Sequence, residues 1–324
     1  MTWPIAWEDI VAARARIAPY LTPTPLRSYA PLDQEIGHGI RVLVKHENHL
    51  PTNAFKARNT MSFLTALPAE QRTHGVVAAT RGNHGAGLAY AGATLGVPVV
   101  ICVPVGNNPE KNAAMRGYGA ELVEQGRDYD EAVEVALELV KQRGLVMAHS
   151  TNDANVIAGA GTLFAELFEQ APRRIDTLVV AVGGGSQAVG ALVAARKLAP
   201  HVEVFGVQAA GASVIHDSWH AKQRLTGASA NTFADGLATR SVYDFTWEPL
   251  RDGLAGFVAV PDAALADAIR VLLRTTHNLA EGAGAAGLAG LYALRERLAG
   301  KTVGIVLSGS NIDAATLRDV LTAR

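Results

Sequence analysis

Lys56 is the residue whose type and position are best suited to covalent chemistry. It lies in the stretch 51–59, PTNAFKARN, between an apolar strand-like run at 42–44 and a predicted helix that begins at Lys56. The positive potential of a helix N-terminus disfavours an ammonium ion. A neutral lysine is a nucleophile that can form a Schiff base with an aldehyde cofactor. Taken alone, this pattern is weak, because a lysine near a helix start is usually a solvated surface residue.

Three further polar clusters each follow an apolar, strand-like run. They are TRGNH at 80–84, GGGSQ at 183–187 and SGSN at 308–311. Backbone N–H groups without side chains in the way, at the start of a helix, make a cradle for an anion. The glycine cluster therefore predicts an anion site, but it matches neither the dinucleotide-binding pattern nor the P-loop.

The elements around these clusters alternate between short apolar strands and helices, which implies a parallel sheet with both faces covered. The predicted strands lie at 41–47, 75–79, 97–103, 120–123, 145–147, 177–182, 203–207, 257–260 and 303–307. The predicted helices lie at 7–18, 56–67, 83–95, 109–118, 129–143, 155–169, 188–198, 263–276, 283–298 and 313–321. The stretch 226–256 is expected to be irregular.

Composition excludes several classes of protein. The 324 residues are 49% hydrophobic, which is enough for a sizeable core, and 29 basic residues balance 30 acidic ones. No basic field is present to hold nucleic acid or an anionic membrane. No apolar run reaches the roughly 18–20 residues that span a bilayer, and no secretory signal is apparent, so a cytoplasmic location is expected. Cys102, the single cysteine, excludes an internal disulfide.

The four motifs together, in this order, resemble those of the fold-type II pyridoxal-phosphate (PLP) enzymes, the tryptophan synthase β family. Within it the chain is most similar to the serine/threonine dehydratases, over about residues 17–311. The resemblance implies two α/β domains, each an open, mostly parallel twisted sheet with helices on both faces. The smaller domain would be residues 50–148, inserted into a large PLP-binding domain formed by residues 1–49 and 149–324.

The resemblance also implies a role for each motif. Lys56 would hold the PLP aldehyde and act as the catalytic base, the glycine cluster would bind the phosphate, Asn83 the ring hydroxyl oxygen, and Ser308 would face the pyridine nitrogen. The implied cofactor-binding residues are Phe55, Lys56, Asn83, Gly183, Gly184, Gly185, Ser186, Gln187, Glu281 and Ser308. The implied substrate-binding residues are Thr80, Arg81, Gly82, Asn83, His84 and Gly236.

Some positions depart from the family pattern. Arg81 occupies the place of a serine that serves racemases as a second acid/base, and arginine cannot be that base. Gln208 replaces a metal-binding glutamate, with Ala212 and Val214 downstream, so no tight divalent-metal site is expected. Three other positions also differ from the motifs: Ala54, Ser186 and Ser310.

The expected activity is PLP-dependent β-elimination from a β-hydroxy-α-amino acid, L-threonine or L-serine, to a 2-oxo acid and ammonia. The alternatives are β-replacement, a larger β-hydroxy substrate such as 3-hydroxyaspartate or phenylserine, and a non-enzymatic PLP carrier or regulatory relative. A small-molecule substrate, no nucleic-acid or membrane partner and a homodimer are expected. Because the sequence ends soon after Ser308, no C-terminal regulatory domain is expected.

Overall fold

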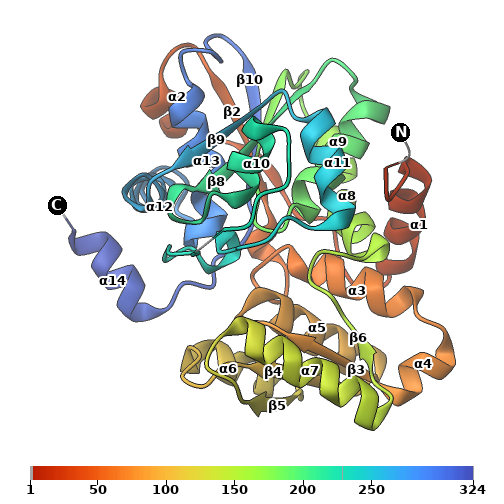
Figure 1. Cartoon of the computed structure of the whole chain (residues 1–324). Coiled ribbons are helices and arrows are strands. Elements are labelled where there is room, and N and C mark those ends of the chain that lie inside the picture. The colour runs from red at the N-terminus through yellow and green to blue at the C-terminus, as the bar shows by residue number, and fades with distance from the viewer. Residues whose placement is uncertain (1–2, 228, 324) are drawn as a thin grey trace.

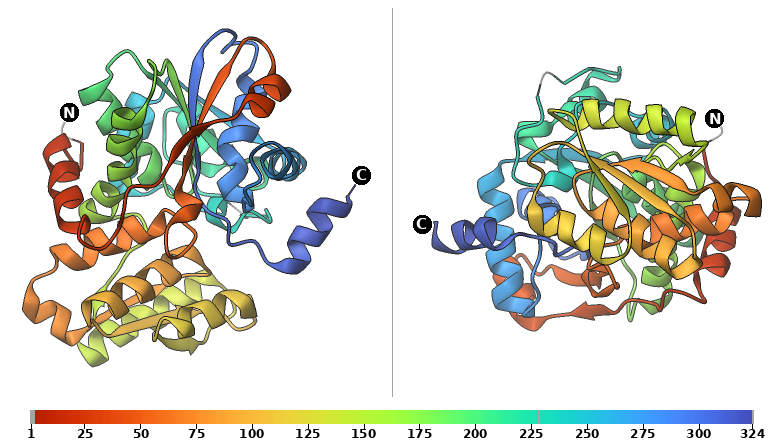
Figure 2. Two further views of the ribbon diagram at one scale, coloured as in Figure 1. Left: turned by 180° about the vertical axis from the view of Figure 1, so that it is seen from behind. Right: turned by 90° about the horizontal axis from the view of Figure 1, so that it is seen from below.

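The computed structural model describes residues 3–227 and 229–323. In this part the chain forms two β-sheets, each surrounded by helices (Figure 1). The predicted domain ranges also include residues 1–2, 228 and 324, which lie outside the described residues. The N-terminal and C-terminal ends of the described chain lie on opposite sides of the molecule (Figure 2).

Six strands form the larger sheet, in the order β1, β2, β10, β7, β8, β9. Only β1, at one edge, is antiparallel to its neighbour. The strands are β1 (Leu26–Ser28), β2 (Arg41–His46), β7 (Thr177–Ala181), β8 (Glu203–Ala209), β9 (Gly256–Val260) and β10 (Thr302–Leu307). Successive side chains of a strand point to opposite faces. Val179 accordingly packs in one apolar core, and Leu178 and Val180 in the other.

Helices cover both faces of this sheet. The core around Leu178 contains side chains of α1 (Trp7–Ile17), α8 (Ala154–Gln170), α9 (Ser186–Leu198), α10 (Val214–Ala221) and α11 (Asp244–Gly253). The core around Val179 contains side chains of α2 (Ala30–Ile36), α12 (Asp262–Thr276), α13 (Gly282–Leu294) and α14 (Ala314–Thr322). Short 3₁₀ turns are η1 (Glu47–His49), η2 (Ala210–Ala212) and η3 (Asp235–Leu237).

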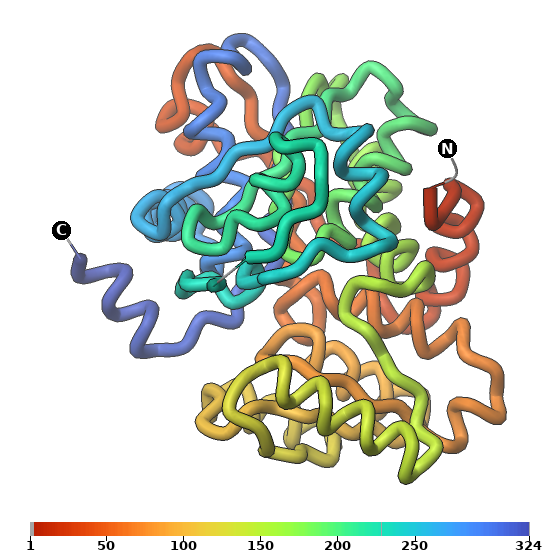
Figure 3. Tube along the Cα trace, viewed as in Figure 1, coloured from red at the N-terminus to blue at the C-terminus, as the bar shows by residue number. Residues whose placement is uncertain are grey.

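Four parallel strands form the smaller sheet, in the order β5, β4, β3, β6. They are β3 (Val76–Ala79), β4 (Val99–Val103), β5 (Glu121–Glu124) and β6 (Val146–Met147). One face packs on α3 (Lys56–Ala66), α5 (Asn83–Leu95) and α6 (Pro109–Gly117), the other on α7 (Tyr129–Arg143); α4 (Ala69–His74) precedes β3. The trace in Figure 3 enters this part of the molecule after β2 and leaves it after β6.

The predicted fold class is confirmed: both sheets are mostly parallel and both are covered on two faces. The domain limits at 49/50 and 148/149 stay a prediction. The expectation that 226–256 is irregular is wrong in part, because α11 lies within it. That helix contains Pro249, which removes one backbone hydrogen-bond donor, and it is held by the packing of Thr246, Trp247 and Leu250 in the interior. The short helices α2, α4 and α10 were not predicted.

Helices α3, α8 and α9 pack with unusually close backbones. A Cβ atom on Gly159 of α8 would lie 2.6 Å from the carbonyl oxygen of Arg58 in α3. A Cβ atom on Gly190 of α9 would lie 2.7 Å from the Cα of Gly161 in α8. Real Cβ contacts are not this short, so each position requires glycine. The packing therefore fixes the spacing between α3, which begins at Lys56, and α9, which begins at the glycine cluster.

Cys102 is buried in β4 as a free thiol, as its apolar setting indicated. No helix among the described residues combines the length and the apolar character needed to cross a membrane.

We predict that Gly159→Ala lowers the free energy of unfolding by about 1–3 kcal/mol, the usual cost of overpacking an interior. The added methyl group must push α3 away from α8, so PLP binding should weaken as well. Thermal unfolding and a PLP titration measure the two effects.

Gly117→Ala is the matched control. Gly117 is in the last turn of α6, and a Cβ there would meet nothing within 4 Å. It should leave both measurements close to those of the unaltered protein. Equal behaviour of the two variants would show that the α3–α8 approach tolerates a side chain.

Candidate active site

A cavity of about 330 Å³ lies where several strands of both sheets end. Thr80 follows β3, Gly183 follows β7 and Ser308 follows β10, so residues at the carboxyl ends of these strands meet there. All the residues predicted to bind cofactor or substrate line this cavity: Phe55, Lys56, Thr80, Arg81, Gly82, Asn83, His84, Gly183, Gly184, Gly185, Ser186, Gln187, Gly236, Glu281 and Ser308. The structure brings them together, while their individual roles stay predictions.

Lys56 is held at the cavity by the backbone that precedes it and by a hydrogen bond from its own amine. The Phe55 N–H donates to the Ser308 carbonyl at 2.9 Å, and the Ser310 N–H donates to the Asn53 carbonyl at 2.9 Å. The Lys56 Nζ donates to the Ser150 carbonyl at 2.8 Å and lies 5.1 Å from the centroid of the Phe55 ring. Burial lowers the pKa of Lys56 from 10.5 to about 8, because a charged amine is poorly solvated there.

The glycine cluster at the start of α9 packs too closely against its neighbours to accept side chains. A Cβ atom on Gly183 would lie 2.1 Å from the Gly236 carbonyl oxygen, and one on Gly184 would lie 2.2 Å from the Thr151 Oγ1. Gly185 has a φ of +102°, which disfavours any other residue. The helix begins at Ser186, two residues before its predicted start, so Gln187 is also in its first turn.

Gln187 gives a test of whether this cradle fits a phosphate group. Its side chain is 3% exposed, and neither its amide nitrogen nor its amide oxygen has a partner in the protein. Unpaired buried polar groups are rare and call for an explanation, such as a missing ligand. Open glycine backbone, a helix N-terminus and this orphaned amide together fit the phosphate of PLP.

A chain of side-chain hydrogen bonds includes two residues of the cavity wall, Asn83 and Glu281. The Asn311 amide donates to Asn83 Oδ1 at 2.7 Å, and the Asn83 amide donates to Glu281 Oε1 at 2.6 Å. Burial raises the pKa of Glu281, opposed by the charge of Lys111 and the hydrogen bond from Asn83. The Ser308 hydroxyl, which is 4% exposed, donates to the Ala283 carbonyl at 3.3 Å.

The loop before α5 presents backbone amides and one exposed cation. The Gly82 N–H donates to Thr80 Oγ1 at 3.2 Å, and Arg81 is exposed. The His84 Nε2 lies 2.9 Å from the Ala148 carbonyl, which can only accept, so Nε2 carries the proton. Burial, with the charge of Lys56, lowers the pKa of His84 to about 3. His84 is therefore neutral, consistent with a structural side chain.

Sequence reasoning missed most of the charged residues that form ion pairs at the mouth of the cavity. Lys111 of α6 pairs with Asp235, and Arg240 pairs with Asp130 and lies 3.8 Å from Asp128. These five residues line the cavity and join the part with the smaller sheet to the loop at 235–240. In the sequence, a single charged residue that lines a cavity looks the same as one on the solvated surface. Only Asp235 had a neighbouring clue, because it lies beside Gly236, which was predicted to bind substrate.

The comparisons with known proteins agree with this geometry. The sequence profile described as "Pyridoxal-phosphate dependent enzyme" matches residues 17–309. The chain belongs to this family. The predicted family resemblance and the predicted cofactor, PLP, are thereby confirmed.

The chain is similar in sequence to several proteins that are named as amino-acid ammonia-lyases. An L-threonine ammonia-lyase of Geobacter sulfurreducens is 38% identical over 87% of this chain and 70% of its own length. An L-threo-3-hydroxyaspartate ammonia-lyase of Saccharomyces cerevisiae is 31% identical over 95% of this chain and 93% of its own length. The crystal structure of a T.th. threonine deaminase superposes with a TM-score of 0.90, at 35% identity, over 95% of this chain and 99% of that one.

The described residues contain no group of three or more His, Cys, Asp or Glu side chains that could hold a metal ion. Gln208, at the position of the metal-binding glutamate, accepts a hydrogen bond from the His216 N–H at 3.0 Å. The expectation that no tight divalent-metal site exists stays a prediction.

Gly184→Ala should weaken PLP binding at least about tenfold, equivalent to ~1.4 kcal/mol, because its methyl group would enter the anion cradle at Thr151. Equilibrium titration with PLP measures the loss, and thermal unfolding of the PLP-free protein checks that the fold is kept. Wild-type affinity in this variant would move the phosphate away from these glycines.

The attachment of PLP to the PLP-free protein should speed up as pH rises through about 8, the pKa of Lys56, and level off above it. Only the neutral amine attacks an aldehyde, and a lysine at its ordinary pKa of 10.5 would still be gaining rate at pH 10. Stopped-flow absorbance of lysine-bound PLP measures the profile. A midpoint near 10 would contradict a desolvated Lys56.

Proposed function

We propose that this enzyme is a PLP-dependent ammonia-lyase that acts on a β-hydroxy-α-amino acid, L-threonine or L-serine. The observation that carries the proposal is the placement of Lys56, with its lowered pKa, in one cavity with the glycine cradle and the Ser308 hydroxyl. The named relatives support the same reaction class. When bound, PLP supplies an electron sink for the charge that develops on the substrate α-carbon.

Each cluster of the cavity has a part in this proposal. Lys56 would hold the cofactor covalently, and its neutral amine would be the base that takes the α-proton of the substrate. The backbone amides of Gly183–Gln187 and the N-terminus of α9 hold the cofactor phosphate. The amides between Thr80 and His84, at the start of α5, hold the substrate carboxylate. Asn83 is fixed between Asn311 and Glu281 to meet the ring oxygen.

Ser308 favours elimination over transamination. A hydroxyl leaves the pyridine nitrogen essentially neutral, whereas a carboxylate would protonate it. Such a ring would be a weaker electron sink, so prompt loss of a β-leaving group would be preferred. Loss of the β-hydroxyl as water, followed by tautomerisation and hydrolysis, releases a 2-oxo acid and ammonia.

Arg81 disfavours a racemase and supports a second candidate substrate. Its guanidinium stays protonated and cannot be the second base that racemisation needs. The Arg81 guanidinium, which lines the cavity, would pair with the side-chain carboxylate of 3-hydroxyaspartate. One relative of this chain is named as an L-threo-3-hydroxyaspartate ammonia-lyase. We rank this substrate second, because Arg81 is exposed and equally suits the α-carboxylate.

We also infer that residues 50–148 form a smaller domain, with residues 1–49 and 149–324 forming the larger one. The separate sheets support this division. A homodimer remains a proposal that rests on the resemblance alone, and a cytoplasmic location remains a proposal as well.

Oxo-acid release, measured with L-serine, L-threonine, 3-hydroxyaspartate and phenylserine without added thiol, tests the proposal. Lys56→Ala should lower the rate at least about a hundredfold, because the base is lost. Lys197→Ala, on the exposed end of α9, should not change it. Equal rates for Lys56→Ala and the wild type would remove Lys56 from the mechanism, and turnover only in the presence of thiol would favour β-replacement.

A further inference from the structure

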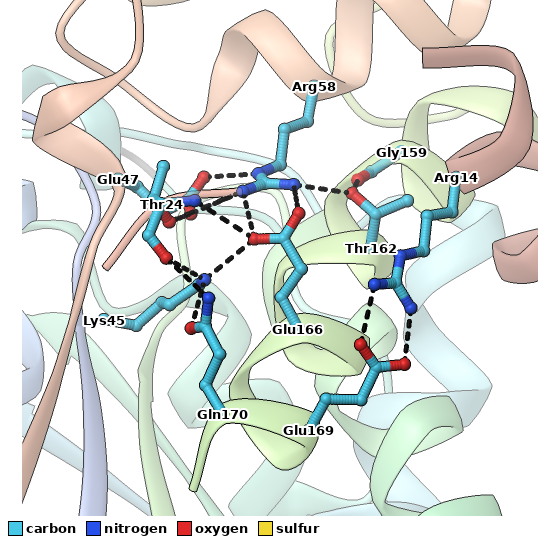
Figure 4. Close-up of polar contacts among 10 residues, drawn as sticks. All are labelled: Arg14, Thr24, Lys45, Glu47, Arg58, Gly159, Thr162, Glu166, Glu169 and Gln170. Atoms are coloured by element: carbon cyan, nitrogen blue, oxygen red, sulfur yellow. Dashed lines mark hydrogen bonds and ion pairs between the residues drawn. The ribbon is translucent and has the colours of Figure 1, made fainter. Parts of the chain in front are cut away.

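Four charged side chains are buried together behind the cavity: Lys45, Glu47, Arg58 and Glu166, hereafter the charge quartet (Figure 4). Their side chains are between 0% and 6% exposed. They come from β2, η1, α3 and α8, so the quartet joins the helix of Lys56 to three other elements. Nothing in the proposed chemistry uses them.

Arg58 is the centre of the quartet. Its Nε and Nη2 donate to the two carboxylate oxygens of Glu47 at 2.7 and 3.1 Å. Its Nη1 and Nη2 donate to the two oxygens of Glu166 at 2.7 and 2.8 Å. The Thr162 hydroxyl accepts a further bond from Nη1 at 3.3 Å. Two bidentate pairs hold the planar guanidinium in one orientation.

Lys45 completes the set. Its Nζ donates to the Thr24 carbonyl at 2.7 Å, to Glu166 at 2.8 Å and to Gln170 at 3.0 Å, which uses all three of its donors. Two positive and two negative groups make the quartet neutral. Burial lowers the pKa of Lys45, and the charges of Glu166 and Glu47 oppose this. Burial would raise the pKa of Glu166, but the hydrogen bonds and charges of Arg58 and Lys45 outweigh it and lower that pKa.

The quartet lies next to the parts that hold Lys56. Arg58 is two residues after Lys56, in the first turn of α3. Glu166 is on α8, the helix that follows Ser150, whose carbonyl accepts from the Lys56 Nζ. The neighbouring Asn59 donates to the Ser186 Oγ at 3.4 Å, which links the same turn to the start of α9. A rotation or shift of α3 would therefore move Lys56 relative to both Ser150 and the glycine cradle.

A buried ion pair is an inefficient source of stability, because desolvation offsets the attraction, whereas it does impose a defined geometry. A well-packed apolar group could join α3 to α8 without the directional bonds that Arg58 makes. Directional bonds are required if the Lys56 amine is to be positioned to within a fraction of an ångström.

We propose that the charge quartet is a positioning site, which fixes the first turn of α3 and so places the Lys56 amine relative to the PLP-binding cradle. Arg58 and its two glutamates act through Lys56 and touch neither cofactor nor substrate. The proposal rests on the role of Lys56 in the proposed function, but not on the identity of the substrate.

Three variants separate position from charge balance. Glu166→Gln leaves one buried positive charge without a partner. Lys45→Met/Glu166→Gln removes one charge of each sign and is balanced, and the Thr24 carbonyl keeps its bond from Gln170 at 3.0 Å. Glu166→Asp keeps the charge and shortens its reach by one methylene. The last two are expected to fold even if Glu166→Gln does not.

The control is an ion pair that joins α1 to α8, the helix of Glu166. Arg14 pairs with Glu169 at 2.5 Å, one turn beyond Glu166, with side chains 37% and 54% exposed (Figure 4). Arg14→Gln/Glu169→Gln removes an ion pair from α8 without touching the quartet, and it should leave every measurement at the wild-type value.

The measurements are the melting temperature of the holoenzyme, the visible absorbance of lysine-bound PLP at saturating PLP, its pH midpoint, and kcat and KM separately. Glu166→Gln should melt lowest. The two balanced variants should regain most of the melting temperature, yet show a shifted pH midpoint and a kcat at least about tenfold below wild type, with KM within about threefold.

Wild-type absorbance, pH midpoint and kcat in either balanced variant would overturn the proposal, since the quartet would then only balance charge. Failure of the proposed function is distinguishable from this result. If the wild-type protein releases no oxo acid from any amino acid tested, the proposed function fails, while absorbance and pH midpoint still decide the role of the quartet.

Discussion

The spacing between Lys56 and the glycine cradle depends on how closely three helices approach one another. α3 begins at Lys56, α9 begins at the cradle, and α8 lies between them with Gly159 against one and Gly161 against the other. Without side chains at these points the helix backbones are almost in contact, and their separation cannot adjust freely. Two chemical groups far apart in the sequence are thereby held at a fixed distance, before any ligand binds.

Buried charges act on the same helices in a different way. Close packing fixes the distance between α3 and α8, but it constrains the rotation of α3 about its own axis less strongly. The fork of Arg58, with Glu47 on one side and Glu166 on the other, resists that rotation because its hydrogen bonds lie in one plane. The exposed pair Arg14–Glu169, between α1 and α8, lacks this effect, since water competes for both groups.

Different parts of the cavity favour different charge states. Lys56 is poorly solvated and has a lowered pKa, and Glu281 has a raised one, so burial favours the neutral form of both. The glycine cradle, in contrast, favours an anion. The cavity also contains ion pairs at its mouth, Lys111 with Asp235 and Arg240 with Asp130, which are partly exposed and join the two halves of the molecule. The interior is thus arranged for a cofactor with one charged end and a reactive aldehyde.

The local order of residues was sufficient to predict the alternation of strands and helices and the glycine cradle, and the resemblance of the motifs to a known family supplied the other predicted site residues that line the cavity. Hydrophobic period and glycine-rich turns are local properties, and the motifs at Lys56, Thr80, Gly183 and Ser308 each follow a strand. Long-range proximity is not a local property. The partners of Arg58, the ion pairs at the cavity mouth, the helix around Pro249 and the lowered pKa of Lys56 all arise from residues brought together by folding, because burial and contact exist only in the packed chain.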